Sequence, residues 1–398
     1  MSLQKGNNKG WEKVTLGDCV SLMKSGLSRK LSTTDIGMPM LRSNNIGSKH
    51  CIFDDIKYWY VNDPQGANTK NYVLDDGDLL VNFINSIAQI GKACIFKNEI
   101  NRACLYTTNI LRIKPNSKID SDFLYFITQT FEYSLFVKNI TKPAVNQASF
   151  TTADFKEYSF PLPTLPEQTA IASLLSTWDL AIEKTERLIA AKETQYTSLV
   201  KMKIADKCDS WAHLRADKIF KSISEKQNSD EELLSVTQDR GVIPRSMLEG
   251  RVMSPESGTD TYKLIKIGDF AISLRSFQGG IEYSRYQGLI SPAYTVLRPK
   301  LEIDDDFYRH FFKSYLFIEK YLSIAVIGIR DGKQISIPDF MTVKIPLPPI
   351  EEQKQIAAIL TTARQEIDLL KQQAEAYRRQ KRGLMQRLLT GEWRVRMG

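Results

Sequence analysis

The chain is poor in the residues that build metal sites and disulfide frameworks. Its 398 residues include three His and five Cys, and the cysteines (Cys19, Cys51, Cys94, Cys104 and Cys208) form no C-x-x-C pair. We therefore expect neither a zinc site nor a disulfide framework, and a reducing compartment fits best. The first ten residues, MSLQKGNNKG, are polar, and no window approaches the roughly 20 apolar residues of a membrane span. These features predict a cytoplasmic protein with no membrane partner.

Motifs of the common nucleotide-dependent enzymes are also missing. The sequence contains neither the Asn-Pro-Pro motif of adenine methyltransferases nor a G-x-x-x-x-G-K-[ST] phosphate loop. Asp75, Asp76 and Asp78 lie close together, but a solvated turn explains them better than a nuclease site. His50, His213 and His310 have no neighbouring arrangement that suggests a nucleophile, so each is interpreted as a core or surface residue. The sequence predicts a non-catalytic chain without a metal or cofactor of its own.

The net charge of +8 suggests a polyanionic partner, and its distribution is uneven. Residues 1–150 carry 18 basic and 13 acidic side chains, and residues 341–398 carry 11 and 6, so each segment has a net charge of +5. Residues 208–340 carry 18 and 19, a net charge of −1. Any nucleic-acid surface in that second large segment would have to be local.

An internal repeat organises the chain at an offset of 185 residues. The segment DFKEYSFPLPTLPEQTAIASLL (154–175) aligns without gaps to DFMTVKIPLPPIEEQKQIAAIL (339–360), with ten of 22 positions identical. Pro-Leu-Pro should stop a short strand after Phe160 and after Ile345, because proline lacks a backbone donor. Glu167 and Glu352 then occupy the first turn of a helix, where negative charge is favoured. We interpret this motif as a hinge between a domain and a helix, rather than as a catalytic glutamate.

Long helices are predicted after each hinge. Apolar residues recur at alternating steps of four and three over more than four heptads, which is typical of a coiled coil. The predicted interface between the two helices consists of Ile171, Leu175, Trp178, Ile182, Ile189, Tyr196 and Leu199 in the first helix, and of Ile356, Leu360, Ile367, Leu370, Tyr377, Leu384 and Leu388 in the second. If the intervening domain begins and ends at one place, the two helices run antiparallel and the molecule is pseudo-twofold symmetric.

The two large segments are predicted to be domains of mixed α/β fold. Each contains a turn-strand signal, DDGDLLVNF (75–83) or IKIGDFAISL (265–274), followed by an aromatic helix. Their loops are rich in Lys, Arg, Asn, Gln and Ser, which pair with base edges and phosphates. Solvated loops are the plain alternative for each residue. The candidate DNA-binding residues are Lys24, Ser25, Arg29, Lys30, Arg42, Ser43, Asn44, Asn45, Lys49, Asn85, Ser86, Gln89, Lys92, Lys142, Asn146, Gln147, Arg240, Arg245, Arg275, Ser276, Gln278, Arg285, Arg330, Lys333 and Gln334.

The chain resembles the specificity subunit of type I restriction–modification enzymes over residues 11–396. The resemblance is carried by WEKVTLGD (11–18), MPMLRSNNI (38–46), GDLLVNFINSIAQIGKACIF (77–96), the two Pro-Leu-Pro repeats and LMQRLLTGEWRV (384–395). It implies an α/β (α+β) protein with a first target recognition domain (1–165), a first spacer helix (166–207), a second recognition domain (208–350), a second spacer helix (351–392) and a tail (393–398).

The resemblance also implies the partners. Each recognition domain would read one half of a bipartite target in double-stranded DNA, and the helices would set the spacing and dock two modification (methyltransferase) subunits. Restriction (motor-nuclease) subunits would join the complex. S-adenosylmethionine, ATP and Mg²⁺ would belong to those partners and not to this chain. The modification subunits would methylate adenine.

Three other interpretations stay open from the sequence. The chain could be a solitary DNA-binding or antirestriction protein of the same architecture, an enzyme with an unrecognised site, or a scaffold that uses only its helices. Co-purification with a methyltransferase, methyl transfer by the isolated chain and sequence-selective DNA binding would distinguish them.

Overall fold

A computed structural model describes residues 3–5, 10–145, 147–226, 230–248, 259–274, 279–328 and 334–396. The chain forms two compact units. Unit 1 contains Met1–Lys184 and Ala374–Gly398, and unit 2 contains Thr185–Gln373. Among the described residues, no helix is both long and apolar enough to cross a membrane.

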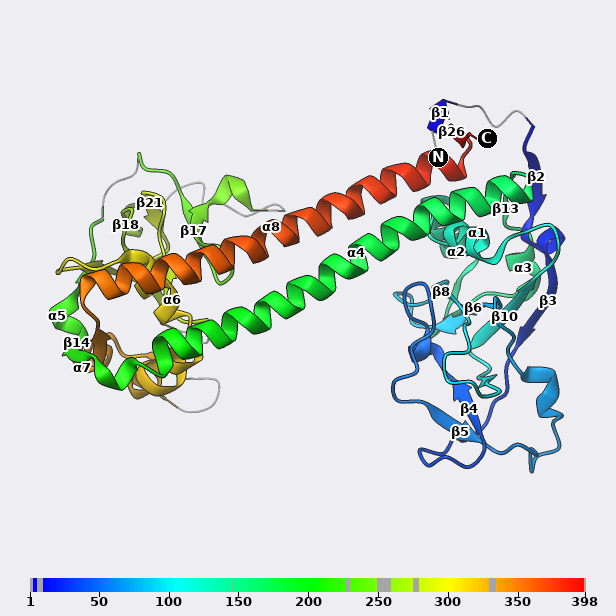
Figure 1. Cartoon of the computed structure of the whole chain (residues 1–398), viewed down its shortest axis with the longest axis horizontal. Coiled ribbons are helices and arrows are strands. Elements are labelled where there is room, and N and C mark those ends of the chain that lie inside the picture. Colours follow the sequence, from blue (N-terminus) through cyan, green and yellow to red (C-terminus); the bar gives the residue numbers. More distant parts are fainter. Residues whose placement is uncertain are drawn as a thin grey trace. The chain divides into compact units, whose positions relative to one another are not determined.

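Unit 1 is built on a four-stranded antiparallel sheet in the order β3-β10-β6-β8 (Figure 1). Smaller sheets have the orders β5-β4-β9, β11-β12-β7, β13-β2 and β1-β26. The strands are β1 (Leu3–Lys5), β2 (Glu12–Thr15), β3 (Val20–Ser25), β4 (Met38–Leu41), β5 (Lys57–Trp59), β6 (Leu79–Asn82), β7 (Ile84–Asn85), β8 (Ala93–Ile95), β9 (Leu105–Tyr106), β10 (Ile110–Pro115), β11 (Lys142–Pro143), β12 (Ala148–Ser149), β13 (Ser159–Leu162) and β26 (Trp393–Val395).

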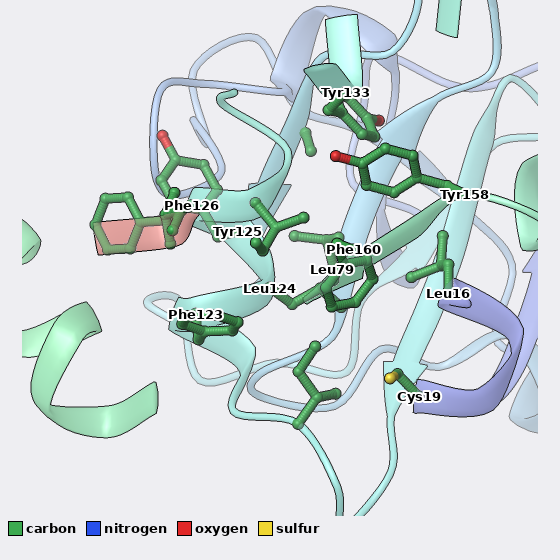
Figure 2. Packing of buried hydrophobic residues seen from close by; sticks show 14 of the residues in the cluster. Leu16, Cys19, Leu79, Phe123, Leu124, Tyr125, Phe126, Tyr133, Tyr158 and Phe160 are labelled. Atoms are coloured by element: carbon green, nitrogen blue, oxygen red, sulfur yellow. The ribbon is translucent and has the colours of Figure 1, made fainter. Parts of the chain in front are cut away.

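Helices cover the main sheet of unit 1 and share one apolar core with it. These are α1 (Ser121–Ile127), α2 (Phe131–Ile140) and α3 (Thr152–Lys156), together with the first part of α4 (Leu165–Val200) and the last part of α8 (Ile350–Leu389). Figure 2 shows the core, in which the rings of Tyr133 and Tyr158 meet edge to face at 5.4 Å. Ile171 and Leu388 are fully buried in the same cluster. The long helices are therefore part of the domain core and not an appendage to it.

Unit 2 repeats this plan with the sheet order β15-β22-β19-β20. Its strands are β14 (Ala212–Arg215), β15 (Phe220–Ile223), β16 (Leu234–Thr237), β17 (Gly241–Pro244), β18 (Lys263–Ile265), β19 (Phe270–Ser273), β20 (Glu282–Tyr283), β21 (Gly288–Ile290), β22 (Tyr294–Pro299), β23 (Val326–Ile327), β24 (Gln334–Ile335) and β25 (Lys344–Leu347). Its helices are α5 (Ala216–Ile219), α6 (Asp305–Phe312) and α7 (Ile337–Thr342), with the remaining parts of α4 and α8.

The mixed α/β fold and the two long helices are confirmed, with two differences in detail. β13 includes Pro161, paired with Lys13, so Pro-Leu-Pro does not stop the strand at Phe160. The strand continues because, among the described residues, β13 pairs with β2 alone, and an edge strand tolerates a missing donor. The first long helix keeps α-helical geometry to Val200 and ends in a π-helical turn, Lys201–Ala205.

Candidate nucleic-acid interface

A buried Asp–Arg pair supports the main sheet in both units. Asp78 and Asp269 are each 1% exposed. Asp78 forms an ion pair with Arg112 Nε at 2.6 Å, and Asp269 accepts a hydrogen bond from Arg298 Nη2 at 2.7 Å. Each carboxylate also accepts the backbone N–H of the residue three positions earlier. Burial raises the pKa of Asp78. The prediction that Asp78 belongs to a solvated turn is therefore wrong. Its carboxylate is buried against Arg112 of β10, which is more than thirty residues away in the sequence.

The repeated Glu-Gln dipeptide ties the start of each long helix to its domain. Glu167 accepts a hydrogen bond from Trp11 Nε1 at 3.2 Å and pairs with Arg394. Glu352 accepts from Trp211 Nε1 at 3.1 Å and from Lys207 Nζ at 2.9 Å. Each carboxylate is therefore bound to an indole N–H and to a cation, which supports a structural role for this motif.

The neighbouring glutamine connects each long helix to the first helix of the aromatic region. Gln168 Oε1 accepts the backbone N–H of Asp120 at 2.8 Å, and Gln353 Oε1 accepts that of Asp304 at 2.9 Å. Asp120 and Asp304 in turn cap α1 and α6. The two copies of the repeat thus use the same side chain for the same contact.

A small three-stranded sheet brings two predicted DNA-binding segments of unit 1 together. β12 pairs with β7 through Ala148 and Asn85, and β12 also pairs with β11 through Ser149 and Lys142. Residues 84–92 and 141–149 are about fifty positions apart in the sequence, yet they leave this sheet side by side. The two segments contain Lys92 and Lys142 and no acidic residue.

In unit 2, a two-stranded sheet lies beside Leu274, the residue that follows β19. β23 pairs with β24 through Val326 and Ile335, and Ile335 N–H donates to the carbonyl of Leu274 at 2.8 Å. Gln334 is exposed on β24. Five other predicted residues of this region lie outside the described residues: Arg275, Ser276, Gln278, Arg330 and Lys333.

The predicted side chains of unit 1 fall into two groups. Several are exposed to solvent, namely Lys30, Asn44, Ser86, Gln89, Lys92, Lys142 and Gln147. Ser25, Ser43 and Asn85 are half-buried, and Asn146 lies outside the described residues. The exposed set contains three lysines and several amides, so it offers both charge and base-pairing groups.

The second group is engaged within the domain. Arg29 pairs with Asp63 at 2.5 Å, Arg42 donates to the carboxylate of Asp55 at 2.8 Å, and Lys49 pairs with Asp122 at 2.6 Å. Lys24 lies 3.9 Å from the centroid of the Tyr72 ring. Asn45 is 1% exposed, and its amide accepts from Arg42 N–H and donates to the carbonyls of Ile52 and Asp54. These side chains are held by partners within the domain and shape the loops, so they are less available to a ligand than the exposed group.

Three predicted arginines of unit 2 also have partners within the unit or limited exposure. Arg240 donates to the carbonyl of Met247 at 3.1 Å, and Arg285 lies 3.4 Å from the carboxylate of Asp306. Arg245 is half-buried, and its Nε and Nη1 atoms are buried without a hydrogen-bond partner among the described residues.

A cavity of about 760 Å³ lies beside the three-stranded sheet of unit 1. Its walls include Ile87, Val137 and Pro143, with Lys92 and Lys138 contributing positive charge and no acidic residue taking part. Within the described part of the chain, no group of three or more His, Cys, Asp or Glu side chains is placed to hold a metal ion. The cavity therefore extends the basic, acid-free surface next to the two predicted segments.

The long helices pack against each other in antiparallel fashion within each unit. In unit 1, Trp178 meets Tyr377 edge to face at 5.7 Å, and Asp179 pairs with Lys381. In unit 2, Lys192 pairs with Glu366 at 2.8 Å. Within unit 1, Glu167 pairs with Arg394 and Asp179 with Lys381, and within unit 2, Lys192 pairs with Glu366 and Lys207 with Glu352. In each unit the numbering therefore rises along the first segment as it falls along the second, which confirms the predicted direction.

The predicted apolar positions of the two helices face inward. Every residue of the predicted helix interface is buried or half-buried: Ile171, Leu175, Trp178, Ile182, Ile189, Tyr196, Leu199, Ile356, Leu360, Ile367, Leu370, Tyr377, Leu384 and Leu388. Leu180 and Leu369, which lie outside this pattern, are 49% and 64% exposed.

Some contributors to the surface are not among the residues predicted from the sequence. Lys138 lies on α2 and lines the cavity, but α2 was read only as an aromatic helix. Ile87 and Val145 are exposed apolar residues within the two loops, whose predicted binding residues are all polar. An apolar residue inside a polar loop is the sequence signal that marks both.

The sequence matches the family described as type I restriction modification DNA specificity domain over residues 8–193 and 212–376. The MjaX specificity subunit of Methanocaldococcus jannaschii is 29% identical, with 97% of this chain and 94% of that protein covered. The MjaVIII specificity subunit of the same organism is 25% identical, with 97% and 93% covered.

Solved structures share the fold. The S subunit of a type I restriction–modification system from M. genitalium has a TM-score of 0.58 at 16% identity, with 98% of this chain and 97% of that chain covered. A chain from a structural study of complex assembly in a type I R-M system has a TM-score of 0.53 at 16% identity, with 98% and 100% covered.

Proposed function

Because this chain belongs to the type I restriction modification DNA specificity family, we propose that it reads a bipartite target in double-stranded DNA. Specificity subunits are non-catalytic DNA-recognition components of restriction–modification complexes. We assign residues 1–165 and 208–350 as the two target recognition domains and residues 166–207 and 351–392 as spacer helices. Each domain would read one half-site.

The observation that carries this proposal is the three-stranded sheet of unit 1. It joins residues 84–92 and 141–149, two loops that expose lysines and amides and contain no acid. Charge of one sign favours a polyanion, while Asn and Gln offer paired donors and acceptors that suit adenine. A solvated loop needs neither property, so their combination on one sheet supports DNA reading.

In the proposed mechanism, one set of residues contacts the phosphates and another set contacts the bases. Lys30, Lys92, Lys138 and Lys142 would contact phosphates, which releases counterions and makes the affinity fall with salt. The exposed amides of Gln89 and Gln147 would contact base edges. In unit 2, the exposed amide of Gln334 would serve the second half-site.

We propose that the helices serve as spacer and docking surface. The number of residues in α4 and α8 would determine the spacing of the half-sites, and two modification subunits would bind along the helices. Those subunits would supply S-adenosylmethionine and the methyl transfer to adenine, and restriction subunits would supply ATP- and Mg²⁺-dependent cleavage. The assembly would act on chromosomal DNA in the cytoplasm.

Mapping of methylated adenines tests this function. A host that expresses the chain with its modification subunit should acquire methylation at one two-part sequence motif, absent when the chain is omitted. Methylation without a common motif, or none at all despite co-purification of the two subunits, would contradict the proposal.

A second measurement addresses the non-catalytic role. The isolated chain, mixed with DNA and S-adenosylmethionine, should transfer no methyl group, while it should bind the mapped motif more tightly than unrelated duplexes. Methyl transfer by the chain alone would assign it to the enzymes instead.

A further inference from the structure

Two large apolar side chains project from the proposed reading surface of unit 1. Ile87 is 74% exposed and Val145 is 99% exposed. Nearby Ile90 packs against the core of the unit, so the loop as a whole is not turned outward. Exposed apolar residues are common when they occur singly, but these two belong to the paired segments on one sheet.

Both side chains lie where their segments turn. Ala144 N–H donates to the carbonyl of Gln147 at 2.7 Å and closes a turn around Val145. Gln89 N–H and Ile90 N–H donate to the carbonyl of Ser86 at 2.9 and 3.0 Å and close a turn around Ile87. Ala148 pairs with Asn85 in antiparallel register, so both turns leave the sheet at the same end.

The surroundings restrict the partner that could cover these side chains. The two loops and the cavity beside them expose Lys92, Lys138 and Lys142 and include no acid. A matching ligand carries negative charge and also offers an apolar group among hydrogen-bonding groups. In the major groove of DNA, the 5-methyl group of thymine is the apolar group beside the base edges.

We propose that Ile87 and Val145 are specificity-determining residues that contact thymine methyl groups in the half-site read by unit 1. The inference rests on the proposed DNA-reading function and names the base feature that these residues recognise. It requires no hydrogen bond from either side chain, since shape and apolar contact distinguish thymine from cytosine and from uracil.

Deoxyuridine provides a test that leaves the protein unaltered, because it differs from thymidine only by the missing methyl group. The full-length chain would be bound to duplexes of the mapped motif with thymidine replaced, one position at a time, by deoxyuridine. We expect an affinity loss of about fourfold at one or two positions of one half-site, the size of a buried methyl contact.

Variants then assign the contact. I87A and V145A should bind thymidine and deoxyuridine duplexes alike at those positions, while V61A, which shortens another exposed valine of unit 1, should keep the full discrimination. Equal binding of both duplexes by the unaltered chain, or unchanged discrimination in both I87A and V145A, would overturn the inference while sequence-selective binding persists. If the unaltered chain bound all duplexes alike, whatever their sequence, both the proposed function and this inference would be contradicted.

Discussion

Gln168 and Gln353 are single residues that connect a long helix to the domain beside it. Gln168 is fully buried, accepts from Asp120 N–H and donates to the carbonyls of Lys118 and Pro163 at 3.0 and 2.9 Å. Gln353 is 1% exposed and makes two such bonds, with Asp304 N–H and the Pro348 carbonyl. Each glutamine thus supplies hydrogen bonds to backbone groups of the domain beside its helix.

Replacing these glutamines by methionine should therefore destabilise the protein. Each buried backbone group left without a partner costs roughly 1–3 kcal/mol, so we expect Q168M to cost more than Q353M. Urea unfolding followed by fluorescence would measure the loss. Q355M, on the exposed face of α8, is the matched control and should stay within about 0.5 kcal/mol of the unaltered chain. A Q355M loss as large as that of Q168M would contradict this account.

His310 links three helices of unit 2. Its ring nitrogens lie 2.8 Å from Tyr196 Oη on α4 and 3.0 Å from Thr361 Oγ1 on α8. The side chain is 4% exposed, and burial, helped by the neighbouring Arg309, lowers the pKa of His310 to about 3. Burial therefore favours the neutral ring in the folded protein.

A pH dependence follows from this lowered pKa. In the unfolded chain His310 takes up a proton near pH 6.5, whereas the folded protein does so only near pH 3. The stability that the neutral ring contributes is therefore fully present above pH 6.5 and is lost as the pH falls, by at most about 1.4 kcal/mol per pH unit. H310Q should unfold with a weaker pH dependence between pH 7 and 5. Parallel curves for H310Q and the unaltered chain would rule this out.

Helix α8 contains one interior glycine. Around Gly383, an added Cβ would meet no atom within 4 Å, and the helix continues through it to Leu389. Gly391 follows the helix end with a φ of +76°, a conformation that favours glycine. The glycine inside α8 has no need of its conformational freedom, whereas the glycine just after the helix end adopts a positive φ.

Alanine should have opposite effects at these two positions. G383A should stabilise the protein by about 0.5–1 kcal/mol, because glycine loses more backbone entropy than alanine in a helix. G391A should destabilise it by about 1 kcal/mol, because alanine is strained at positive φ. Thermal unfolding of both variants measures the two signs. Destabilisation by G383A would show that the position has a packing or binding role.

Among elements, strands were harder to predict than helices. The long helices repeat one pattern over many turns, so errors at single positions average out. Short strands such as β11 and β12 contain two residues each, and their pairing with β7 depends on contacts between distant segments. β13 passes through Pro161 because no strand of the described part of the chain pairs with its other edge, which is a property of the sheet and not of the residue.

For the whole molecule, the proposed spacer role predicts that the length of α4 sets the spacing between the two DNA half-sites. Inserting about four residues, roughly one helical turn, should change the spacing between the half-sites and leave both half-site sequences unaltered. Methylated-adenine mapping with the insertion variant would show the new spacing. An unchanged spacing in an active complex would refute the spacer role. A two-residue insertion in the 60–68 loop of unit 1 is the control and should leave the spacing as it was.

The repeat of one plan in both units predicts that the half-sites are exchangeable. Replacing residues 208–333 by the corresponding segment of a relative should change one half-site and preserve the other. The same mapping would score the result. A change in both half-sites would mean that the two domains read DNA as one unit, contrary to the proposal.

The sequence by itself determined the internal repeat, the two long helices, their inward faces and the family. Each of these is written in contiguous residues, because helical periodicity and the Pro-Leu-Pro and Glu-Gln motifs act over a few turns. Tertiary structure alone decided which loops share a surface and which polar side chains are free. Asn45 and Gln89 look alike in sequence, yet the first is enclosed by the carbonyls of its own loop and the second is exposed. The difference arises because the partners of a polar side chain come from other parts of the chain, which only folding brings near it.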